Sequence, residues 1–183
     1  MLFRSPLMMM SQAIQVIEDV IPETYQDRIE QLMTDVRFPW GYLNDVTYSD
    51  TDRDKGETPG FAHLFFDKAT GTQSEHCNFI LPLLWQFAPK QHDLWRIKGG
   101  LLLNTNEGPN NKHVDHNEPH TTALYYVNDT DGDTVFFDEY GDIFYRSEPK
   151  KGKVVIFDGS IYHASTCPSL TTTRIALNFN YDC

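Results

Sequence analysis

The segment NKHVDHNEPH, residues 111–120, places three histidines and two acidic residues within ten positions. Imidazole nitrogens and carboxylate oxygens are common ligands of transition metals, so the segment could hold a metal ion. However, 7 histidines and 26 acids among 183 residues give about one His-x-acid pair by chance (7 × 26/183 ≈ 1). The chain has two, His113-x-Asp115 and His116-x-Glu118, so a polar loop is the better interpretation of this segment taken alone.

Two residues farther along the chain favour the metal site. His163 follows the apolar segment GKVVIFD, and Arg174 opens the segment RIALNFNYD eleven residues later. Two imidazoles and one carboxylate form a facial triad, which leaves three positions open on an octahedral metal, as in non-haem Fe(II) oxygenases. Those positions suit an α-keto acid and O2, and an arginine about one strand away offers paired donors to a distal carboxylate. A carboxylate ligand leaves no vacancy for a halide, so Asp115 favours hydroxylation over halogenation.

The segments that would carry these residues have the pattern of short β-strands. From residue 94 onward, runs rich in β-branched and aromatic residues alternate with turn signals. Six runs are predicted as strands: LWRIKGGLLLNTN, TTALYYVND, DTVFFDEYG, DIFYRSEP, GKVVIFDGS and TRIALNFNYD. Strands at this spacing predict an all-β sandwich or barrel, for which a jelly roll is the natural candidate. Residues 111–120 then lie in a connection between two core strands, where β scaffolds commonly carry function.

The first half of the chain shows helical spacing instead. Apolar residues recur at every third or fourth position over 22–35, which predicts a helix there. The segment NFILPLLWQFA, residues 78–88, predicts a second helix that packs on the core. AIQVIEDV, residues 13–20, is a short apolar segment that could form a strand before the first helix.

Residues 37–60 are polar, broken by glycine and proline, and carry Trp40 and Tyr42. They are predicted to form either a substrate lid or a solvated hairpin with packed aromatic side chains. A chain of this length forms one ordinary domain, so we expect a single domain over 1–183. Within it, residues 1–93 would supply the helices and a possible substrate loop, and residues 94–183 the β core with the metal site.

Composition limits the partners of the chain. A formal charge of −11 repels polyphosphate, so an extended nucleic-acid surface is not expected, and a small molecule, peptide or protein is favoured. The three cysteines are widely separated and predict neither a disulfide framework nor a Cys-rich zinc site. No apolar run approaches the length that spans a bilayer, and the N-terminus does not have the pattern of a secretory signal. We therefore expect a cytoplasmic protein without membrane contact, whose oligomeric state is left open.

As a set, the motifs from residue 94 to 182 resemble the Fe(II)/2-oxoglutarate-dependent dioxygenases, closest to the prolyl 4-hydroxylase-like branch. The family's His-x-Asp motif is similar to HVD, and its next strand, often ending in -YY-N, to TALYYVN. The family's glycine-containing hairpin is similar to GDTVFF. The segment that carries its second histidine resembles PKKGKVVIFDGSIYH, and its final basic strand resembles RIALNFNYD. This resemblance implies a mainly β protein with N-terminal helices, whose core is a double-stranded β-helix, an eight-stranded jelly roll of cupin-like form.

The same resemblance implies roles for individual residues. The catalytic Fe(II) would be held by His113, Asp115 and His163. Arg174 would pair with the C5 carboxylate of 2-oxoglutarate, and Tyr126 would donate to the same end. Asn104, nine residues before His113, stands where relatives often have a tyrosine near the co-substrate, and its amide is expected to donate there.

The implied reaction hydroxylates a C–H bond while 2-oxoglutarate and O2 are consumed, succinate and CO2 are released, and ascorbate serves as a reductant. The expected substrate is a prolyl or other residue in a peptide or protein. A free amino acid, small metabolite or nucleobase is the alternative, and a non-catalytic β-barrel with a structural metal is a third hypothesis. Three departures from the family pattern concern the substrate more than the chemistry: Asn104, the lengthened interval before Arg174, and Asn180 where some prolyl hydroxylases carry an aromatic residue. His116, Glu118 and His120 are expected to surround the site.

Overall fold

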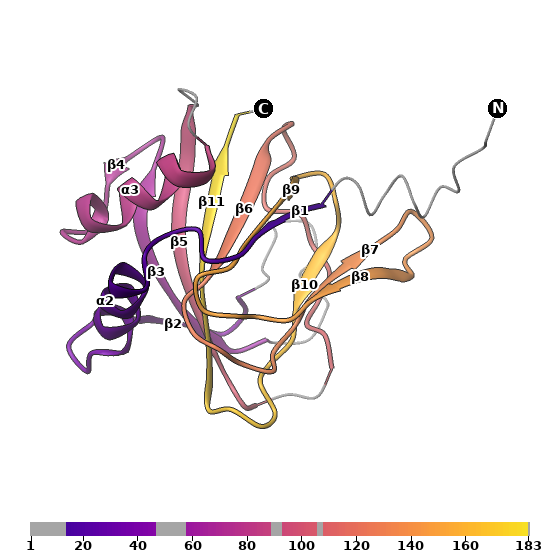
Figure 1. Ribbon diagram of the computed structural model, residues 1–183. Helices are drawn as coiled ribbons and strands as arrows, with labels where there is room; N and C mark the ends of the chain where they lie inside the picture. The colour runs from indigo at the N-terminus through magenta and orange to yellow at the C-terminus, as the bar shows by residue number, and fades with distance from the viewer. Residues whose placement is uncertain (1–13, 47–57, 89–92, 106–107, 183) are drawn as a thin grey trace.

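The computed structural model describes residues 14–46, 58–88, 93–105 and 108–182 and consists of two antiparallel sheets (Figure 1). The larger sheet has the order β1-β9-β6-β11-β5-β3-β2, with β4 paired to β3, and the smaller has the order β10-β7-β8. The strands are β1 (Ile14–Ile17), β2 (Gly41–Leu43), β3 (Gly60–Asp67), β4 (Gly71–Thr72), β5 (Leu94–Leu103), β6 (Thr121–Tyr126), β7 (Thr134–Phe137), β8 (Ile143–Ser147), β9 (Val154–Asp158), β10 (His163–Ser165) and β11 (Thr173–Tyr181). This mainly β architecture confirms the predicted jelly-roll class.

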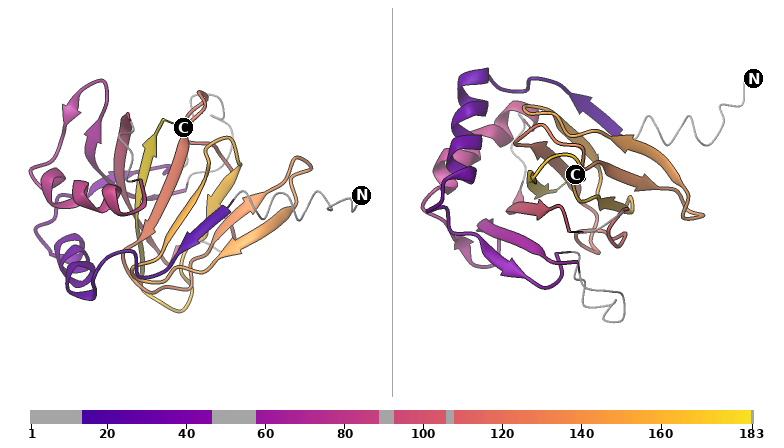
Figure 2. Two further views of the ribbon diagram at one scale, coloured as in Figure 1. Left: turned by 45° about the horizontal axis from the view of Figure 1, so that its top comes forward. Right: turned by 90° about the horizontal axis from the view of Figure 1, so that it is seen from below.

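The two helices, α2 (Glu23–Thr34) and α3 (Cys77–Phe87), pack on one face of the larger sheet. The smaller sheet lies on the opposite side of the molecule (Figure 2). Ile29 and Met33 of α2, and Ile80 and Leu83 of α3, are fully buried against the sheet. Removing these apolar side chains from water is the main force that holds the helices in place.

The two faces of strand β11 lie in different environments. Side chains alternate between the faces of a strand, so residues two apart share a face. Ile175, Leu177, Phe179 and Tyr181 belong to the core beneath the helices. Arg174, Ala176, Asn178 and Asn180 therefore face the other way, into the space between the two sheets. The apolar face of β11 anchors the strand, and the opposite face carries its polar residues into the interior.

The structure confirms most of the predicted elements. Each of the six runs from residue 94 onward contains a strand, both predicted helices are present, and the early apolar segment forms β1 at the edge of the larger sheet. Strands β3 and β10 were not predicted. Strand β3 (GFAHLFFD) lacks a clean alternation, because its pairing with β5 shifts register between Leu64 and Phe66. Strand β10 has only three residues, and its pairing with β7 defines it.

The segment 37–60, predicted as a lid or a hairpin, lies partly outside the described residues, at 47–57. Its described start forms β2, which pairs with β3. Trp40 packs against the helix core, and its indole N–H donates to the Met33 carbonyl at 3.0 Å. Tyr42 is 61% exposed and contacts Phe61 edge-on. Trp40 is therefore a packing residue, while the lid itself stays a prediction.

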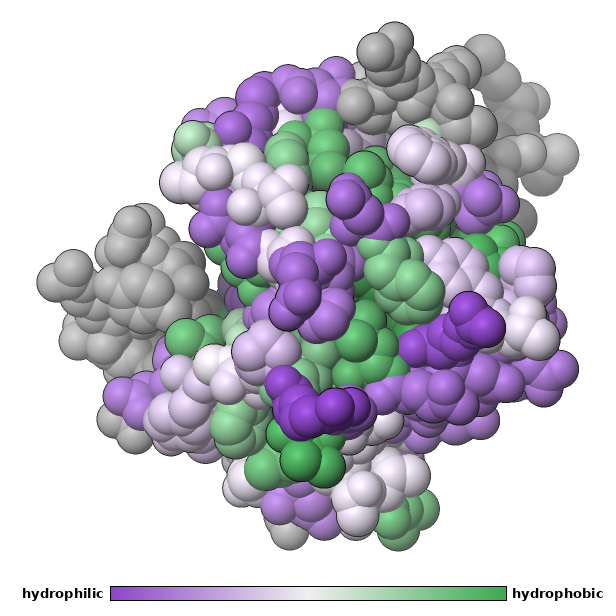
Figure 3. All heavy atoms as spheres, turned by 90° about the vertical axis from the view of Figure 1, so that its left-hand side faces the viewer, coloured by the Kyte–Doolittle hydropathy of each residue, from purple (hydrophilic) through white to green (hydrophobic). Residues whose placement is uncertain are grey.

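None of the helices in the described part of the chain is both long and apolar enough to cross a bilayer. On the face that carries the helices, hydrophobic side chains are interspersed with hydrophilic ones (Figure 3). The apolar sides of both helices are turned inward to the sheet, which accounts for this mixed exterior.

Candidate metal centre

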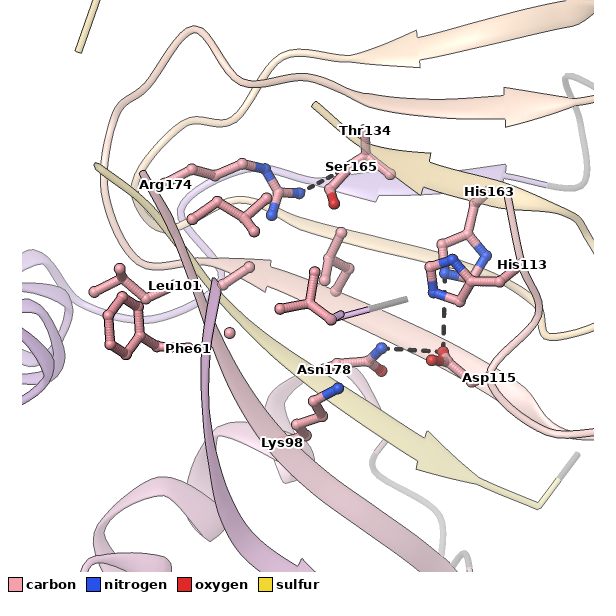
Figure 4. A pocket seen from close by; sticks show the side chains of 15 residues that line it. Phe61, Lys98, Leu101, His113, Asp115, Thr134, His163, Ser165, Arg174 and Asn178 are labelled. Carbon is pink, nitrogen blue, oxygen red and sulfur yellow. Dashed lines mark hydrogen bonds and ion pairs between the residues drawn. The ribbon is translucent and has the colours of Figure 1, made fainter. Parts of the chain in front are cut away.

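A pair of backbone hydrogen bonds brings the two halves of the candidate metal site together. His113 lies in the connection between β5 and β6, and His163 begins β10. The backbone N–H of each histidine donates to the carbonyl of the other at 3.0 Å, which forms an isolated antiparallel bridge. Asp115 follows two residues after His113. The ligand atoms of these three side chains lie within 4.8 Å of one another (Figure 4).

Hydrogen bonds fix the direction of both imidazole rings. Nδ1 of His113 lies 3.1 Å from the Asn111 carbonyl, and Nδ1 of His163 lies 3.1 Å from the Ile161 carbonyl. A carbonyl only accepts, so each Nδ1 carries a proton, which leaves Nε2 as the ring nitrogen available to a metal. Burial, reinforced by nearby His113, lowers the pKa of His163 to about 4. At neutral pH His163 is therefore an uncharged imidazole, as metal binding requires.

The Asp115 carboxylate is held on both oxygens. Its side chain is only 6% exposed, and Oδ1 accepts from Nη2 of Arg96 at 2.9 Å. Oδ2 accepts from the Nδ2 amides of Asn178 and Asn180 at 3.0 Å each, and from the Thr122 hydroxyl at 3.3 Å. A buried charge is tolerated when it is paired and hydrogen-bonded in this way. The carboxylate is thus fixed in one orientation before any metal arrives.

Electrostatics keep this carboxylate ionised. Burial by itself would raise the pKa of Asp115, but the charge of Arg96, the two neighbouring histidines and the Asn178 amide hold that pKa well below its usual range. The site therefore presents one anionic oxygen ligand and two imidazole nitrogens. This donor set fits a divalent transition metal with open coordination positions. In the described part of the chain, no other group of three such ligands converges.

A cavity extends from the triad to Arg174 (Figure 4). Its polar lining comprises the triad with Lys98, Thr134, Ser165, Arg174 and Asn178, and apolar side chains such as Phe61, Leu101 and Leu124 complete it. The middle of the lining is open, because a Cβ added to Gly100 would meet no atom within 4 Å. Gly100 is paired with Ala176, so two small residues leave room between the triad and Arg174.

Arg174 is buried at the far end of this cavity. Its Nε donates to the Gly132 carbonyl at 2.7 Å, and Nη2 donates to the Thr134 hydroxyl at 2.8 Å. Its guanidinium carbon also lies 5.7 Å from the centre of the Tyr126 ring. Burial lowers the pKa of Arg174, and among the described residues no carboxylate forms an ion pair with it. The structure thus holds an arginine in place without neutralising its charge.

No protein-family model matches the chain, and no curated protein matches its sequence. Solved structures do match. A 2OG-Fe(II) oxygenase family oxidoreductase from Burkholderia pseudomallei aligns over 95% of this chain and 87% of its own, with a TM-score of 0.72 and 14% identity. The fold is that of the 2OG-Fe(II) oxygenases.

Two further 2OG-Fe(II) oxygenase structures show the same similarity. A Trichoplax adhaerens prolyl hydroxylase, in complex with a peptide of hypoxia inducible factor, aligns over 95% of this chain and 85% of its own, with a TM-score of 0.63 and 11% identity. HygX from Streptomyces hygroscopicus, with nickel and 2-oxoglutarate bound, aligns over 100% of this chain and 87% of its own, with a TM-score of 0.58 and 13% identity. Identities this low establish the shared fold alone.

Within this oxygenase fold, the other predicted residues fall in different places. Tyr126 is fully buried and does not line the cavity; its hydroxyl donates to the Thr134 hydroxyl at 2.8 Å. It therefore touches Arg174 and Thr134 rather than the open space. Asn104 is exposed, and its amide donates to the Ser169 carbonyl at 3.1 Å. The expectation that Asn104 binds the co-substrate finds no support in this placement.

The competing pair His116-x-Glu118 does not converge on the triad. His116 and His120 pack with Trp95, whose ring centre lies 5.6 Å from that of each histidine. His120 is fully buried, and its Nδ1 lies 2.8 Å from the Glu118 carbonyl. These residues form an aromatic cluster next to the site, in agreement with their expected surrounding position.

Sequence reasoning missed two basic residues of the site, Arg96 and Lys98. Both lie on β5, in the run LWRIKGGLLL, two positions apart and thus on one strand face. Asn178, also missed, lies four positions after Arg174 on β11 and shares its face. A polar residue at every second position of an otherwise apolar strand is the local signal that could have revealed all three.

The neutral state of His163 makes the stability of the metal-free protein depend on pH. The unfolded chain binds a proton at His163 near pH 6.5, whereas the folded site resists it until about pH 4. Stability is therefore lost as the pH falls from about 6.5 toward 4, by up to about 3 kcal/mol from this residue. Urea unfolding in the presence of a chelator should show the wild-type free energy of unfolding falling more steeply over this range than that of His163→Gln. Parallel curves for the two proteins would refute the assigned neutral state.

Proposed function

We propose that the protein is an Fe(II)- and 2-oxoglutarate-dependent dioxygenase that hydroxylates a C–H bond. The observation that carries the proposal is the cavity with the His113, Asp115 and His163 triad at one end and Arg174 at the other. A metal ligand set with open positions and an arginine that forms no ion pair with any described carboxylate face the same space. Together they match the two ends of a keto acid that chelates a metal.

The triad would hold the Fe(II). Bound iron supplies activation of O2 coupled to the oxidative decarboxylation of 2-oxoglutarate, with one oxygen atom entering succinate and the other the hydroxylated product. The protein contributes the fixed ligand geometry. Arg96, Asn178 and Asn180 hold the Asp115 carboxylate, and backbone carbonyls hold the two imidazoles. Such outer contacts orient metal ligands and strengthen metal binding.

Arg174 and Thr134 would bind the distal carboxylate of 2-oxoglutarate. The Thr134 oxygen already accepts hydrogen bonds from Arg174 and from Tyr126. With both lone pairs engaged, its own hydroxyl proton is left to donate into the cavity that Thr134 lines. The hydrogen bond from Tyr126 fixes the direction of the Thr134 hydroxyl, so Tyr126 acts on the co-substrate through Thr134. An arginine and a directed hydroxyl together suit a buried carboxylate.

A prolyl or other residue in a peptide or protein is the proposed substrate. The peptide-bound prolyl hydroxylase among the matching structures supports it. A free amino acid or small metabolite is the alternative, and the apolar side chains of Phe61 and Leu101 in the cavity lining suit an aliphatic reacting group in either case. The open space beside the triad argues against a purely structural metal, whose coordination shell is closed.

The enzymatic proposal predicts a visible spectroscopic signature. Anaerobic protein with Fe(II) should develop a charge-transfer band when 2-oxoglutarate is added, because the keto acid chelates the iron. His163→Ala should lose the band, whereas His76→Ala, which changes a histidine outside the triad, should keep it. Under air, the wild-type protein should convert 2-oxoglutarate to succinate. A wild-type protein with neither band nor succinate would rule out the proposed function.

The proposed role of Arg174 is tested by the affinity for 2-oxoglutarate. Arg174→Ala should weaken binding by roughly 2–5 kcal/mol, because a buried carboxylate would lose its cationic partner. Arg146→Ala on β8, where the arginine is exposed, is the matched control and should bind normally. Calorimetric titration of Mn(II)-loaded protein provides the measurement, and circular dichroism checks that the variants fold. Equal affinity in Arg174→Ala and wild type would remove Arg174 from the co-substrate site.

A further inference from the structure

Lys98 is a cation in the candidate active site. It has no role in the proposed chemistry. It lies on β5, and its side chain points into the cavity on the same side as Asn178 and Asp115 (Figure 4). Among the residues that the structure describes, its ammonium group takes part in no hydrogen bond or ion pair. Lys98 is half-buried. An ammonium group that is partly removed from water without a partner is costly, so proteins rarely retain one without a use.

In the described part of the chain, the carboxylate that lines the cavity is already committed to other groups. Asp115 accepts from Arg96 on one oxygen and from two asparagines and a threonine on the other. The neighbour of Lys98 across the strand pair is Asn178, whose amide nitrogen is turned to Asp115. The Asn178 Oδ1 atom is buried without a partner. A neutral amide oxygen can accept a hydrogen bond, but it does not offset the charge of Lys98.

The charges of the site call for a further anion. Among the residues that the structure describes, Lys98 and Arg174 line the cavity together with one carboxylate, Asp115, and Arg96 contacts that carboxylate from outside the lining. A divalent metal adds two positive charges and 2-oxoglutarate brings two negative ones, so loading the site leaves the cationic excess unchanged. Arg96 is paired with Asp115, and Arg174 is assigned to the co-substrate. Lys98 remains.

Lys98 lies away from Arg174, the residue proposed to bind the distal carboxylate of 2-oxoglutarate. The β5–β11 register pairs Lys98 with Asn178 and Leu102 with Arg174. Lys98 therefore lies four residues along the strand from the level of Arg174, roughly 13 Å at the rise of an extended chain. With the distal carboxylate of 2-oxoglutarate at Arg174 and its other carboxylate on the metal, neither is left for Lys98.

We propose that Lys98 binds a carboxylate of the substrate, so that the enzyme acts on a molecule carrying this group close to the reacting C–H bond. This inference rests on the proposed function and narrows its substrate class. Two sources supply the same chemistry: the α-carboxylate of a free amino acid, and the side chain of an acidic residue in a peptide. In both cases the ion pair at Lys98 places the substrate on the metal side of the cavity, away from Arg174.

Binding to full-length protein loaded with Zn(II) and 2-oxoglutarate tests this without turnover. The probes are the twenty free amino acids and their amides, together with N-acetyl aspartate amide and N-acetyl glutamate amide and their asparagine and glutamine counterparts. Ligand-observed NMR ranks the probes, and calorimetry gives the dissociation constants. We expect at least one carboxylate probe to bind tenfold or more tightly than its uncharged counterpart. The free amino acids report the α-carboxylate, and the N-acetyl amides report an acidic side chain.

Variants assign that preference to Lys98. Lys98→Met should abolish it and Lys98→Arg should retain it. Lys150→Met, which changes an exposed lysine outside the cavity, should bind like wild type. All variants should bind 2-oxoglutarate within twofold of wild type.

Three results would overturn the inference: no carboxylate preference in the wild type, a preference that survives in Lys98→Met, or an equal loss of 2-oxoglutarate binding in that variant. The first result is measured on the wild-type protein alone, so it tests the inference even if Lys98→Met does not fold. Failure of the proposed function is distinguishable, because the wild type would then bind no 2-oxoglutarate at all.

Discussion

The burial of the Asp115 carboxylate is the constraint on which the site depends. A charge with 6% side-chain exposure is tolerated only when it is paired and hydrogen-bonded. Those donors come from β5 (Arg96), β6 (Thr122) and β11 (Asn178 and Asn180), three strands that are adjacent in the larger sheet. The register of these three strands therefore depends on their hydrogen bonds to one carboxylate. A slip of one residue would turn these donors to the opposite face and leave the charge unpaired.

The second constraint joins the two sheets. His163 belongs to the smaller sheet through its pairing with β7, and His113 belongs to a connection that leaves the larger one. Their mutual backbone hydrogen bonds link these parts at the point where the metal ligands meet. The two histidines thus sit on paired backbone, which keeps their geometry rigid, while side-chain hydrogen bonds hold Asp115. Arg174 lies on the larger sheet, like the residues that donate hydrogen bonds to Asp115. One sheet therefore positions both ends of the cavity.

The sequence was sufficient for the strands after residue 94, for both helices and for the residues that form the triad. These follow from local periodicity and from the order of the chemically active residues. The alternation along β5 could have pointed to Arg96 and Lys98, but their partners depend on the pairing of β5 with β11, which no local pattern specifies. Asn104 illustrates the opposite error. Its distance from His113 along the chain suggested the cavity, but β5 ends at Leu103 and the side chain turns outward to Ser169.

The proposed function requires that His113, Asp115 and His163 bind one iron ion. Anomalous diffraction at the iron edge, from crystals grown anaerobically with Fe(II), locates that ion. We expect one iron peak within about 2.2 Å of Nε2 of both histidines and of a carboxylate oxygen of Asp115. A peak at the His116 and His120 cluster, or no iron at the triad under saturating Fe(II), would contradict it.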